Sequence, residues 1–582
     1  MNLRPFTHYL RLFARYLKPQ MPATVSMTLL LLVSIGLQLL NPLILRSFID
    51  TIRVHGFSTV LFTAAFLYLG VSLLNEGVSV VANYLSEKVA WTATNHMRAD
   101  LLAHILTLDL KFHQSHTSGE LLERIDGDVD ELSNFFSQML VQMLFHAALL
   151  LAMLIALTCV NWILGLALGL YTIVVVVAVV WLRRPVAAQR IKWREADALF
   201  FGFLSEQLAG REDINANGAR NYVMHRFAQL YHSWFVTIKK AGLTGSTPWI
   251  LSQAMYALGG ILGLVLGAYL WSIGLATPGT VYVIFAYSSL LTKPLDQMLW
   301  QIQDLQQAEA CIQRIQELFQ TTSNVQDGEG LEPGKGRHTL TFDRVSFGYT
   351  EGEPILHDLS FVLPAGHVLG VLGRTGAGKT TLVRLLFRMY DSQSGTIRLG
   401  DVDLRQMKLQ DLRKRIGLIT QEVQLFHASV RDNLTFFNQA IDDEKILNAL
   451  REIGLADWYE SLAKGLDTIL SPDGSGLSAG EAQLLAFARV FLSDPDLVIL
   501  DEASSRLDPA TEQTMKRAMV KLFANRTGLI IAHRLATIQW VSDIMVIEKG
   551  RIVEYAPRAE LAANPNSQFA QLLRHDLGVK NP

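Results

Sequence analysis

Long stretches without a charged residue dominate the first half of the chain. No Asp, Glu, Lys or Arg occurs from Pro19 to Leu45, from Leu132 to Leu182, or from Ala241 to Thr292. From Val54 to Ser86 the only charge is Glu76. A helix that crosses a membrane needs about 20 consecutive, mostly apolar residues. These stretches therefore predict membrane-spanning helices.

The lengths of the stretches set the number of spans. Runs of 27 and 33 residues each hold one span, whereas runs of 51 and 52 residues each hold two spans and a tight turn, near Asn161 and near Gly274–Gly279. We therefore predict an all-α membrane domain of six helices over residues 1–320. The predicted spans cover about residues 22–46, 58–84, 136–158, 162–182, 248–273 and 279–301.

The positive residues near the spans predict their orientation. Lys and Arg gather in the segment before span one and in the loop between spans four and five, and they are scarce on the other side. Positive loops stay in the cytoplasm, so both termini are expected there, in a multi-pass membrane protein. The segment Arg4–Lys18 is expected to lie as an amphipathic helix on the membrane surface. The long connections after spans two and four are expected to be helical extensions of those spans.

Residues 338–575 differ in composition and predict a soluble domain, joined by a linker over residues 321–337. Charged residues make up 47 of the 337 residues up to Arg337 but 57 of the 245 that follow. The whole chain has a net charge of −2, which gives no indication of a nucleic-acid partner. Cys159 and Cys311 are isolated and support neither a disulfide framework nor a metal site.

The segment Gly373–Thr380 carries a phosphate-binding motif. Its sequence, Gly-Arg-Thr-Gly-Ala-Gly-Lys-Thr, fits G-x-x-x-x-G-K-[ST]. It follows the apolar run Val368–Leu372, a predicted buried strand, and precedes a predicted helix. Glycines let backbone N–H groups surround phosphates at the start of a helix. Lys379 can then reach the β- and γ-phosphates, and Thr380 can ligate Mg²⁺.

Two carboxylates and a histidine follow two further predicted strands. The run Leu497–Asp501 ends in a carboxylate that can ligate Mg²⁺, and the adjacent Glu502 can polarise an attacking water. His533 follows the apolar run Gly528–Ala532 and can contact a terminal phosphate. Helix capping by the two carboxylates is the structural alternative.

The segment Leu477-Ser478-Ala479-Gly480-Glu481 is similar to the pattern L-S-G-G-Q of ATP-binding cassette transporters. The chain resembles a half-transporter of the exporter architecture over nearly its whole length. Phe112–Leu121 and Glu206–Phe227 look like the first and second intracellular loops of that family. The other elements occur in the family's order, namely Tyr349, the phosphate loop, Gln421, the signature, Asp501-Glu502, Asp508 and His533.

The resemblance implies an α/β P-loop ATPase domain behind the helical membrane domain, ATP and Mg²⁺ as cofactors, and a dimer with two composite sites. Tyr349 would stack on adenine, and Ser478 and Gly480 would bind ATP held by the opposite subunit. The short turns near Ser115–Ser118 and Asp213–Gly218 would act as coupling helices. The implied catalytic residues are Glu502, His533, Gln421 and Lys379. The implied nucleotide contacts are Tyr349, Gly373, Arg374, Thr375, Gly376, Ala377, Gly378, Lys379, Thr380, Thr381, Ser478, Gly480 and Asp508, with Thr380, Gln421 and Asp501 as metal ligands.

Departures from the family pattern favour a heterodimer over a homodimer. The signature has Ala479 and Glu481 where glycine and glutamine are usual, and Arg506 replaces a small residue before Asp508. The approach to the signature, Ser471–Gly476, is also unusual. A carboxylate beside phosphate is expected to weaken the site that this signature completes, while the chain's own Glu502 is intact. One weak and one strong site are typical of two unlike subunits.

The resemblance further implies export of a small amphiphilic substrate, such as a drug-like molecule, a lipid or a peptide. Import of a siderophore-like substrate and an ATP-gated channel or regulatory ATPase are the alternatives. The substrate itself is not encoded in a motif. Glu76 can line the transport path or be a hydrogen-bonded packing residue. Lys293 and Asp296, around Pro294, can pair with each other or face a wet cavity.

Overall fold

The computed structural model describes residues 16–55, 59–135, 141–334, 336–350, 352–471, 476–501, 509–524, 526–532 and 535–576. Residues 4–15 of the predicted surface helix and residues 136–140 at the start of the third span lie outside this set. The chain divides into two compact units. Unit 1 comprises residues 1–107 and 116–321, and unit 2 comprises residues 108–115 and 322–582.

Unit 1 is built from long helices that cover the predicted spans. They are α2 (Met21–His55), α3 (Thr59–Thr107), α7 (Val141–Val160), α8 (Trp162–Ala209), α10 (Arg220–Ser272), α11 (Pro278–Leu290) and α12 (Thr292–Gln320). Four helices of the described residues are long and apolar enough to cross a membrane: the segment Lys18–Arg53, α3, α7 and α10. Trp162–Ala178 is a shorter apolar stretch of α8. The count of six spans therefore stays a prediction.

The turns between paired spans lie where the sequence placed them. Asn161 begins α8, and its side-chain Oδ1 accepts a hydrogen bond from the Ile163 N–H at 2.9 Å. Thr277 begins α11 in the same manner, with Pro278 as the first helical residue. The first N–H groups of a helix have no partner within the helix, so a polar N-cap such as Asn161 or Thr277 can bond one of them. Proline, as in α11, suits the first helical position because it has no N–H.

The sixth predicted span, 279–301, is not one helix but the two helices α11 and α12, which meet at Leu291. Pro294 explains the break. Its nitrogen has no hydrogen to donate to the Leu290 carbonyl, so the regular i to i−4 pattern is lost at this point.

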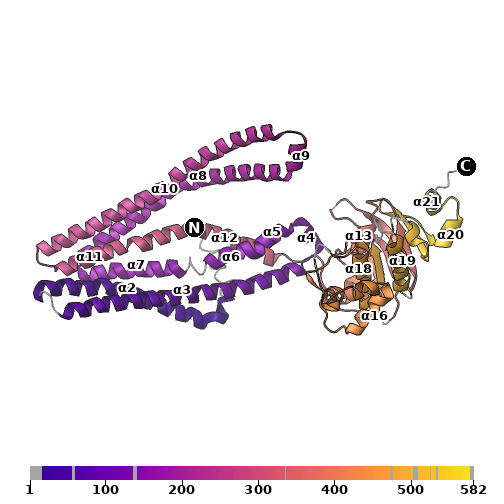
Figure 1. Ribbon diagram of the computed structural model, residues 1–582, viewed down its shortest axis with the longest axis horizontal. Helices are drawn as coiled ribbons and strands as arrows, with labels where there is room; N and C mark the ends of the chain where they lie inside the picture. The colour runs from indigo at the N-terminus through magenta and orange to yellow at the C-terminus, as the bar shows by residue number, and fades with distance from the viewer. Residues whose placement is uncertain are drawn as a thin grey trace. The chain divides into compact units, whose positions relative to one another are not determined.

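The expected helical extensions of unit 1 are present. Helix α8 continues to Ala209, and α10 returns from Arg220, so that the two lie side by side and are joined by α9 (Arg211–Ala216) (Figure 1). The connection after α3 consists of several short helices. They are α4 (Leu110–Ser115), α5 (Ser118–Leu122), one π-helical turn (Glu123–Gly127) and α6 (Asp128–Asn134).

Unit 2 contains a six-stranded sheet in the order β12-β11-β3-β10-β9-β6. The strands β11 (Asp543–Glu548), β3 (Val368–Leu372), β10 (Thr527–Ile531), β9 (Leu497–Asp501) and β6 (Ile416–Ile419) are parallel, and β12 (Arg551–Pro557) is antiparallel. β3 and β10 are buried along their whole length, which is typical of parallel strands covered on both faces.

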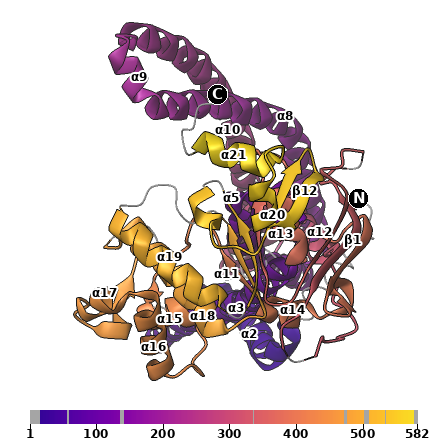
Figure 2. The ribbon, with the colours of Figure 1, turned by 90° about the vertical axis from the view of Figure 1, so that its right-hand side faces the viewer.

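Each parallel strand divides its side chains between two cores. Val498 and Leu500 pack into the core formed with α16 (Asp443–Ile453), α18 (Ala479–Ser493) and α19 (Pro509–Phe523), helices that lie together in Figure 2. Their neighbours Leu497 and Ile499 pack into the opposite core. Successive side chains of a strand point to opposite faces, so both faces need apolar residues.

The opposite core is closed by a second, antiparallel sheet in the order β2-β1-β4-β5 and by helix α13 (Lys379–Leu386). The strands are β1 (Leu340–Phe347), β2 (Leu356–Leu363), β4 (Ser394–Leu399) and β5 (Val402–Asp403). The remaining elements of unit 2 are the helices α14 (Leu409–Arg415), α15 (Val430–Thr435), α17 (Ala456–Glu460), α20 (Arg558–Ala563) and α21 (Gln568–Asp576), and the paired strands β7 (Ala428–Ser429) and β8 (Ile469–Leu470). An α/β nucleotide-binding architecture thus follows the helical unit in the chain, as predicted.

Candidate nucleotide-binding site

The phosphate loop joins β3 to α13, the order that its motif requires. Gly376 and Gly378 have φ values of +84° and +105°, a backbone region that side chains disfavour. A Cβ on Gly378 would approach the Leu356 side chain to 2.5 Å. The left-handed conformation therefore requires glycine at this position, and a larger residue would also displace the end of the Leu356 side chain.

Lys379 is buried and holds the loop in shape. Its Nζ donates hydrogen bonds to the carbonyl oxygens of Gly373 at 2.6 Å and Arg374 at 3.2 Å. Those bonds place the ammonium group inside the curve of the loop. From there it can meet a phosphate that binds to the backbone N–H groups at the start of α13.

A pocket of about 570 Å³ lies over the loop and brings most of the predicted site together. It is lined by nine predicted residues, Tyr349, Thr375, Gly376, Gly378, Lys379, Thr380, Thr381, Gln421 and Asp501, and by Ile355, Arg384 and Ile531. Gly373, Arg374 and Ala377 belong to the same loop without lining the pocket.

The parallel sheet explains why residues distant in sequence meet there. Asp501 ends β9, Gln421 follows β6, and the phosphate loop follows β3. Ile531 at the end of β10 pairs with both Asp501 and Val371. The carboxyl ends of parallel strands form one edge, where ligands of such sheets bind.

The oxygen donors at that edge fit a magnesium ion. Thr380 offers a hydroxyl, Gln421 an amide oxygen and Asp501 a carboxylate, and all three line the same pocket. Mg²⁺ prefers such hard oxygen ligands beside substrate phosphates. Glu502, Asp508 and His533, the other predicted members of the site, lie outside the described residues, as do Arg506 and residues 472–475.

Tyr349 is held at the pocket by two polar contacts. Its hydroxyl receives a hydrogen bond from Arg384 Nη1 at 2.8 Å and lies 3.2 Å from the Thr381 hydroxyl. The Arg384 guanidinium also lies 5.6 Å from the centre of the Tyr349 ring. Arg384 was not among the predicted site residues, because it lies outside the phosphate-loop motif and an arginine on a helix is common. Its position five residues after Lys379 was the available signal.

The signature residues begin α18. Ser478 Oγ accepts from the Glu481 N–H at 3.2 Å, and Glu481 Oε2 accepts from the Ser478 N–H at 2.7 Å. This reciprocal pair is a capping box. The carboxylate of Glu481 thus turns back onto its own chain, a role that glutamine also performs. The residues lining the pocket of this chain include neither Ser478 nor Gly480.

Two of the polar residues noted in the spans have defined surroundings. Asp296 accepts a hydrogen bond from the Tyr256 hydroxyl at 2.7 Å. No ion pair joins it to Lys293 within the described part of the chain, so the first of the two alternatives for these residues, pairing with each other, is not seen. Glu76 is exposed, whereas its neighbour Asn75 accepts from Ser34 of α2 at 2.9 Å.

Known proteins resemble both units. Residues 25–295 match the family model of the ABC transporter transmembrane region, and residues 356–505 match that of the ABC transporter itself. The fatty acid ABC transporter ATP-binding/permease protein of Mycobacterium tuberculosis is 30% identical over 505 residues, which cover 85% of this chain and 78% of that protein.

Two further proteins extend the likeness to almost the entire length. The ATP-dependent lipid A-core flippase of Sodalis glossinidius is 29% identical over 523 residues, 90% of either protein. The solved structure of a bacterial Atm1-family ABC exporter with ATP bound has a TM-score of 0.79 and 27% sequence identity, and the match covers 96% of this chain and 98% of the other.

Proposed function

Because this chain belongs to the ATP-binding cassette transporter family, as a half-transporter of the exporter architecture, we propose that it exports a small amphiphilic molecule across the bacterial inner membrane by alternating access. It is an ATPase coupled to ATP-driven export and a multi-pass membrane protein. The observation that carries the proposal is the pocket that unites Tyr349, the phosphate loop, Gln421 and Asp501.

The residues of the pocket have complementary tasks in ATP hydrolysis. Tyr349 stacks on the adenine, and the backbone of the loop with Lys379 holds the β- and γ-phosphates. Thr380, Gln421 and Asp501 would hold Mg²⁺, which offsets the charge that develops during phosphoryl transfer. Glu502 would orient the attacking water, and His533 would contact the γ-phosphate. Catalysis is then positioning together with electrostatic stabilisation.

A second subunit completes each site. Ser478 and Gly480 at the start of α18 would bind the ATP of the partner, and Asp508 would be a further nucleotide contact. We favour an unlike partner because Ala479 and Glu481 alter the signature. The capping box keeps the Ser478 N–H occupied by a carboxylate, and a negative charge there disfavours a nearby phosphate.

The substrate is proposed to be lipid-like. One relative is named for fatty acids and another for the lipid A core, and both molecules join a polar group to hydrocarbon chains. A cavity for such molecules is formed by apolar residues distributed over several helices and does not require a fixed sequence motif. That accords with a membrane domain in which no sequence motif marks a substrate.

Transport in sealed inside-out vesicles tests the proposal. Vesicles containing the chain and any co-purifying partner should accumulate a fluorescent fatty acid or a fluorescent phospholipid when Mg-ATP is added. Vesicles with Lys379→Ala should not. Loss of preloaded probe from the vesicles on ATP addition would indicate import, and an ATP-opened conductance without accumulation would indicate a channel. A fully active homodimer of this chain alone would contradict the preference for an unlike partner.

A further inference from the structure

The chain enters unit 2 from unit 1 twice, after Thr107 and after Thr321, and returns to unit 1 once, after Ser115. Helix α3 ends at Thr107, and the next residues, Leu108–Ser115, belong to unit 2. Helix α12 ends at Gln320, and the linker after Thr321 also belongs to unit 2. The linker is therefore part of the soluble unit's structure and not a free tether.

The linker lies against the segment that follows β5. The N–H groups of Gly330 and Leu331 donate to the Gln406 carbonyl at 2.9 and 3.1 Å, and that of Gly328 donates to the Met407 carbonyl at 3.2 Å. A Cβ on Gly328 would come within 2.3 Å of the Gln406 backbone. The Asp327 side chain accepts from the Leu409 N–H at 2.8 Å. Four backbone donors thus fix the register of linker and segment.

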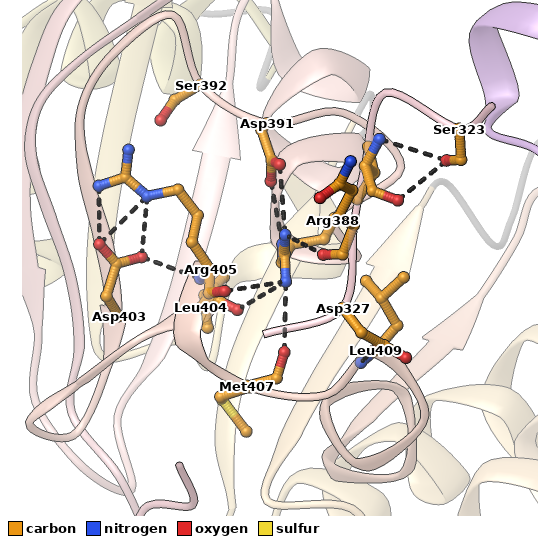
Figure 3. Close-up of polar contacts among 12 residues, drawn as sticks. Ser323, Asp327, Arg388, Asp391, Ser392, Asp403, Leu404, Arg405, Met407 and Leu409 are labelled. Carbon is orange, nitrogen blue, oxygen red and sulfur yellow. Dashed lines mark hydrogen bonds and ion pairs between the residues drawn. The ribbon is translucent and has the colours of Figure 1, made fainter. Parts of the chain in front are cut away.

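Arg388 connects this pair to the rest of the unit, at the centre of Figure 3. Its guanidinium bonds both oxygens of Asp391, at 2.9 and 3.2 Å, and donates to the Gln326 carbonyl of the linker at 2.9 Å. The remaining donors reach the carbonyls of Leu404, Arg405 and Met407 at 3.2 to 3.4 Å. Arg388 is only 4% exposed. The planar fork of arginine allows this number of bonds, and lysine does not.

The backbone of Arg388 adopts a strained conformation within this arrangement. Its φ is +44°, in the left-handed region that costs a side-chain-bearing residue about 1–2 kcal/mol. Such conformations persist where the surroundings over-determine them. Here the bonds of the guanidinium compensate for the strained backbone.

Asp109 ties the linker to the other connection. One carboxylate oxygen accepts from the Asn324 backbone and side chain, at 2.7 and 2.8 Å. The other oxygen accepts from the Phe112 N–H of α4 at 3.0 Å. Asp109 is buried, and charge-assisted bonds in such surroundings are the stronger kind. The start of α4 and the linker are therefore joined directly.

Tyr390 forms a hydrogen bond with the C-terminal part of α4. Its hydroxyl donates to Gln114 Oε1 at 2.8 Å, while its ring lies 5.2 Å from that of Tyr349. Leu110 of α4 packs against the same core as Tyr390. Both connections thus converge on residues 388–391.

That segment directly follows α13, the helix that begins at the phosphate loop. Helix α13 has eight residues, from Lys379 to Leu386, which corresponds to a length of about 12 Å. The helix is a rigid element with the phosphate site at its start. Arg384 on the same helix contacts Tyr349 at the pocket. Any movement of α13 on nucleotide binding must carry Arg388 and Tyr390 with it.

We propose that residues 388–391 form a coupling junction through which α13 moves the linker and α4 together, with Arg388 and Tyr390 as its positioning residues. The proposal rests on the ATP-driven transport described above and adds the residues that connect the nucleotide site to the membrane helices. Rigid bodies joined in this way shift as units between two arrangements.

Hydrogen exchange on the full transporter, with any partner that co-purifies, tests the junction without a transport substrate. In the wild type, Mg-ATP with vanadate should protect peptides of the phosphate loop and change exchange in the ends of α3 and α12. Tyr390→Phe, which removes only the hydroxyl, should keep loop protection and the KM for ATP within twofold. It should lose at least half of the response in α3 and α12. Arg388→Lys should do the same.

Tyr555→Phe is the matched control, because it also removes one tyrosine hydroxyl from unit 2, a donor to the Val362 carbonyl at 2.6 Å. It should leave every response unchanged. The junction is overturned if both Tyr390→Phe and Arg388→Lys keep the full response, if Tyr555→Phe loses it equally, or if the wild type shows none. Loss of loop protection in both junction variants would also overturn it, because the residues would then only support the fold. Vesicle transport is read separately, so failure of export does not mimic these results.

Discussion

The two units of the chain distribute their polar groups in opposite ways. In unit 2 the described polar residues gather in a nucleotide pocket and in the network around Arg388, which bonds the Gln326 carbonyl and the Asp391 carboxylate. In the spans of unit 1 the described polar contacts join side chains of neighbouring helices in small groups, such as Tyr256 with Asp296, or Ser34 with Asn75 and Ser79. From this difference we expect ATP chemistry to depend on a few residues and substrate recognition to be shared among many. Single substitutions should therefore have much larger effects in unit 2.

The largest effect is expected for Lys379→Ala. Its ammonium group sits inside the phosphate loop, and removing a group of this kind from developing charge costs about 10²–10³-fold in kcat. Phosphate release from the purified transporter should fall by at least 100-fold. Lys521→Ala is the control, because Lys521 pairs with Glu452 on the surface of the same unit. Residual activity within tenfold of wild type would remove Lys379 from the catalytic group.

Tyr349→Ala should have the next largest effect. Stacking of a base on an aromatic ring is worth about 1–3 kcal/mol, so the KM for ATP should rise about tenfold or more. Tyr349→Phe keeps the ring and loses only the contacts with Arg384 and Thr381. Its KM should rise less than threefold. Equal effects of the two substitutions would show that the hydroxyl, and not the ring, holds the nucleotide.

The carboxyl group of Asp109 is expected to make the stability of unit 2 depend on pH. Burial alone raises the pKa of Asp109, but hydrogen bonds from Phe112 and Asn324 and the nearby Lys111 charge together hold this pKa below its usual value. A lowered pKa in the folded state stabilises the protein above the ordinary Asp pKa of about 3.9. That stability is lost as the pH falls through the folded-state pKa.

Asp109→Asn should cost about 1 kcal/mol at neutral pH and should remove part of the acid sensitivity. The measurement is the midpoint of thermal unfolding of unit 2, in the full transporter, between pH 7 and pH 3. If the difference between wild type and Asp109→Asn were the same at both ends, the carboxylate charge would have no part in this stability.

Tyr256→Phe should have the smallest effect. It removes one hydrogen bond to Asp296 within the membrane unit, and such bonds average about 0.6 kcal/mol. Thermal stability should change little, and vesicle transport of the lipid probe should stay within twofold. A loss of transport above tenfold would show that unit 1 also concentrates its function in single polar residues.

The sequence was most informative where a ligand requires particular backbone. Gly378 and Lys379 could be placed because phosphate binding demands glycine at left-handed positions and a cation at the helix start. Asp501 could be placed because it ends an apolar run that predicts a strand, and Gln421 could be placed through the family pattern. The charge-free runs predicted the long helices because a bilayer excludes charge from long segments.

Other features depend on tertiary contacts that have no pattern in sequence. Pro294 was visible, but the division of the last span into α11 and α12 became apparent only in the structure. Glu481 was read as a charge beside phosphate, and its capping of Ser478 shows a second role. Arg388 gave no signal at all. Its function arises from carbonyl oxygens of residues up to 62 positions away, and any residue can supply a carbonyl.

The most direct test of the account measures ATP hydrolysis and probe accumulation in the same inside-out vesicles. We expect both to require Mg-ATP, to keep a constant ratio of rates as ATP is varied, and to disappear in Lys379→Ala. Accumulation that continues in Lys379→Ala while hydrolysis is abolished would contradict the claim that the pocket over the phosphate loop drives export.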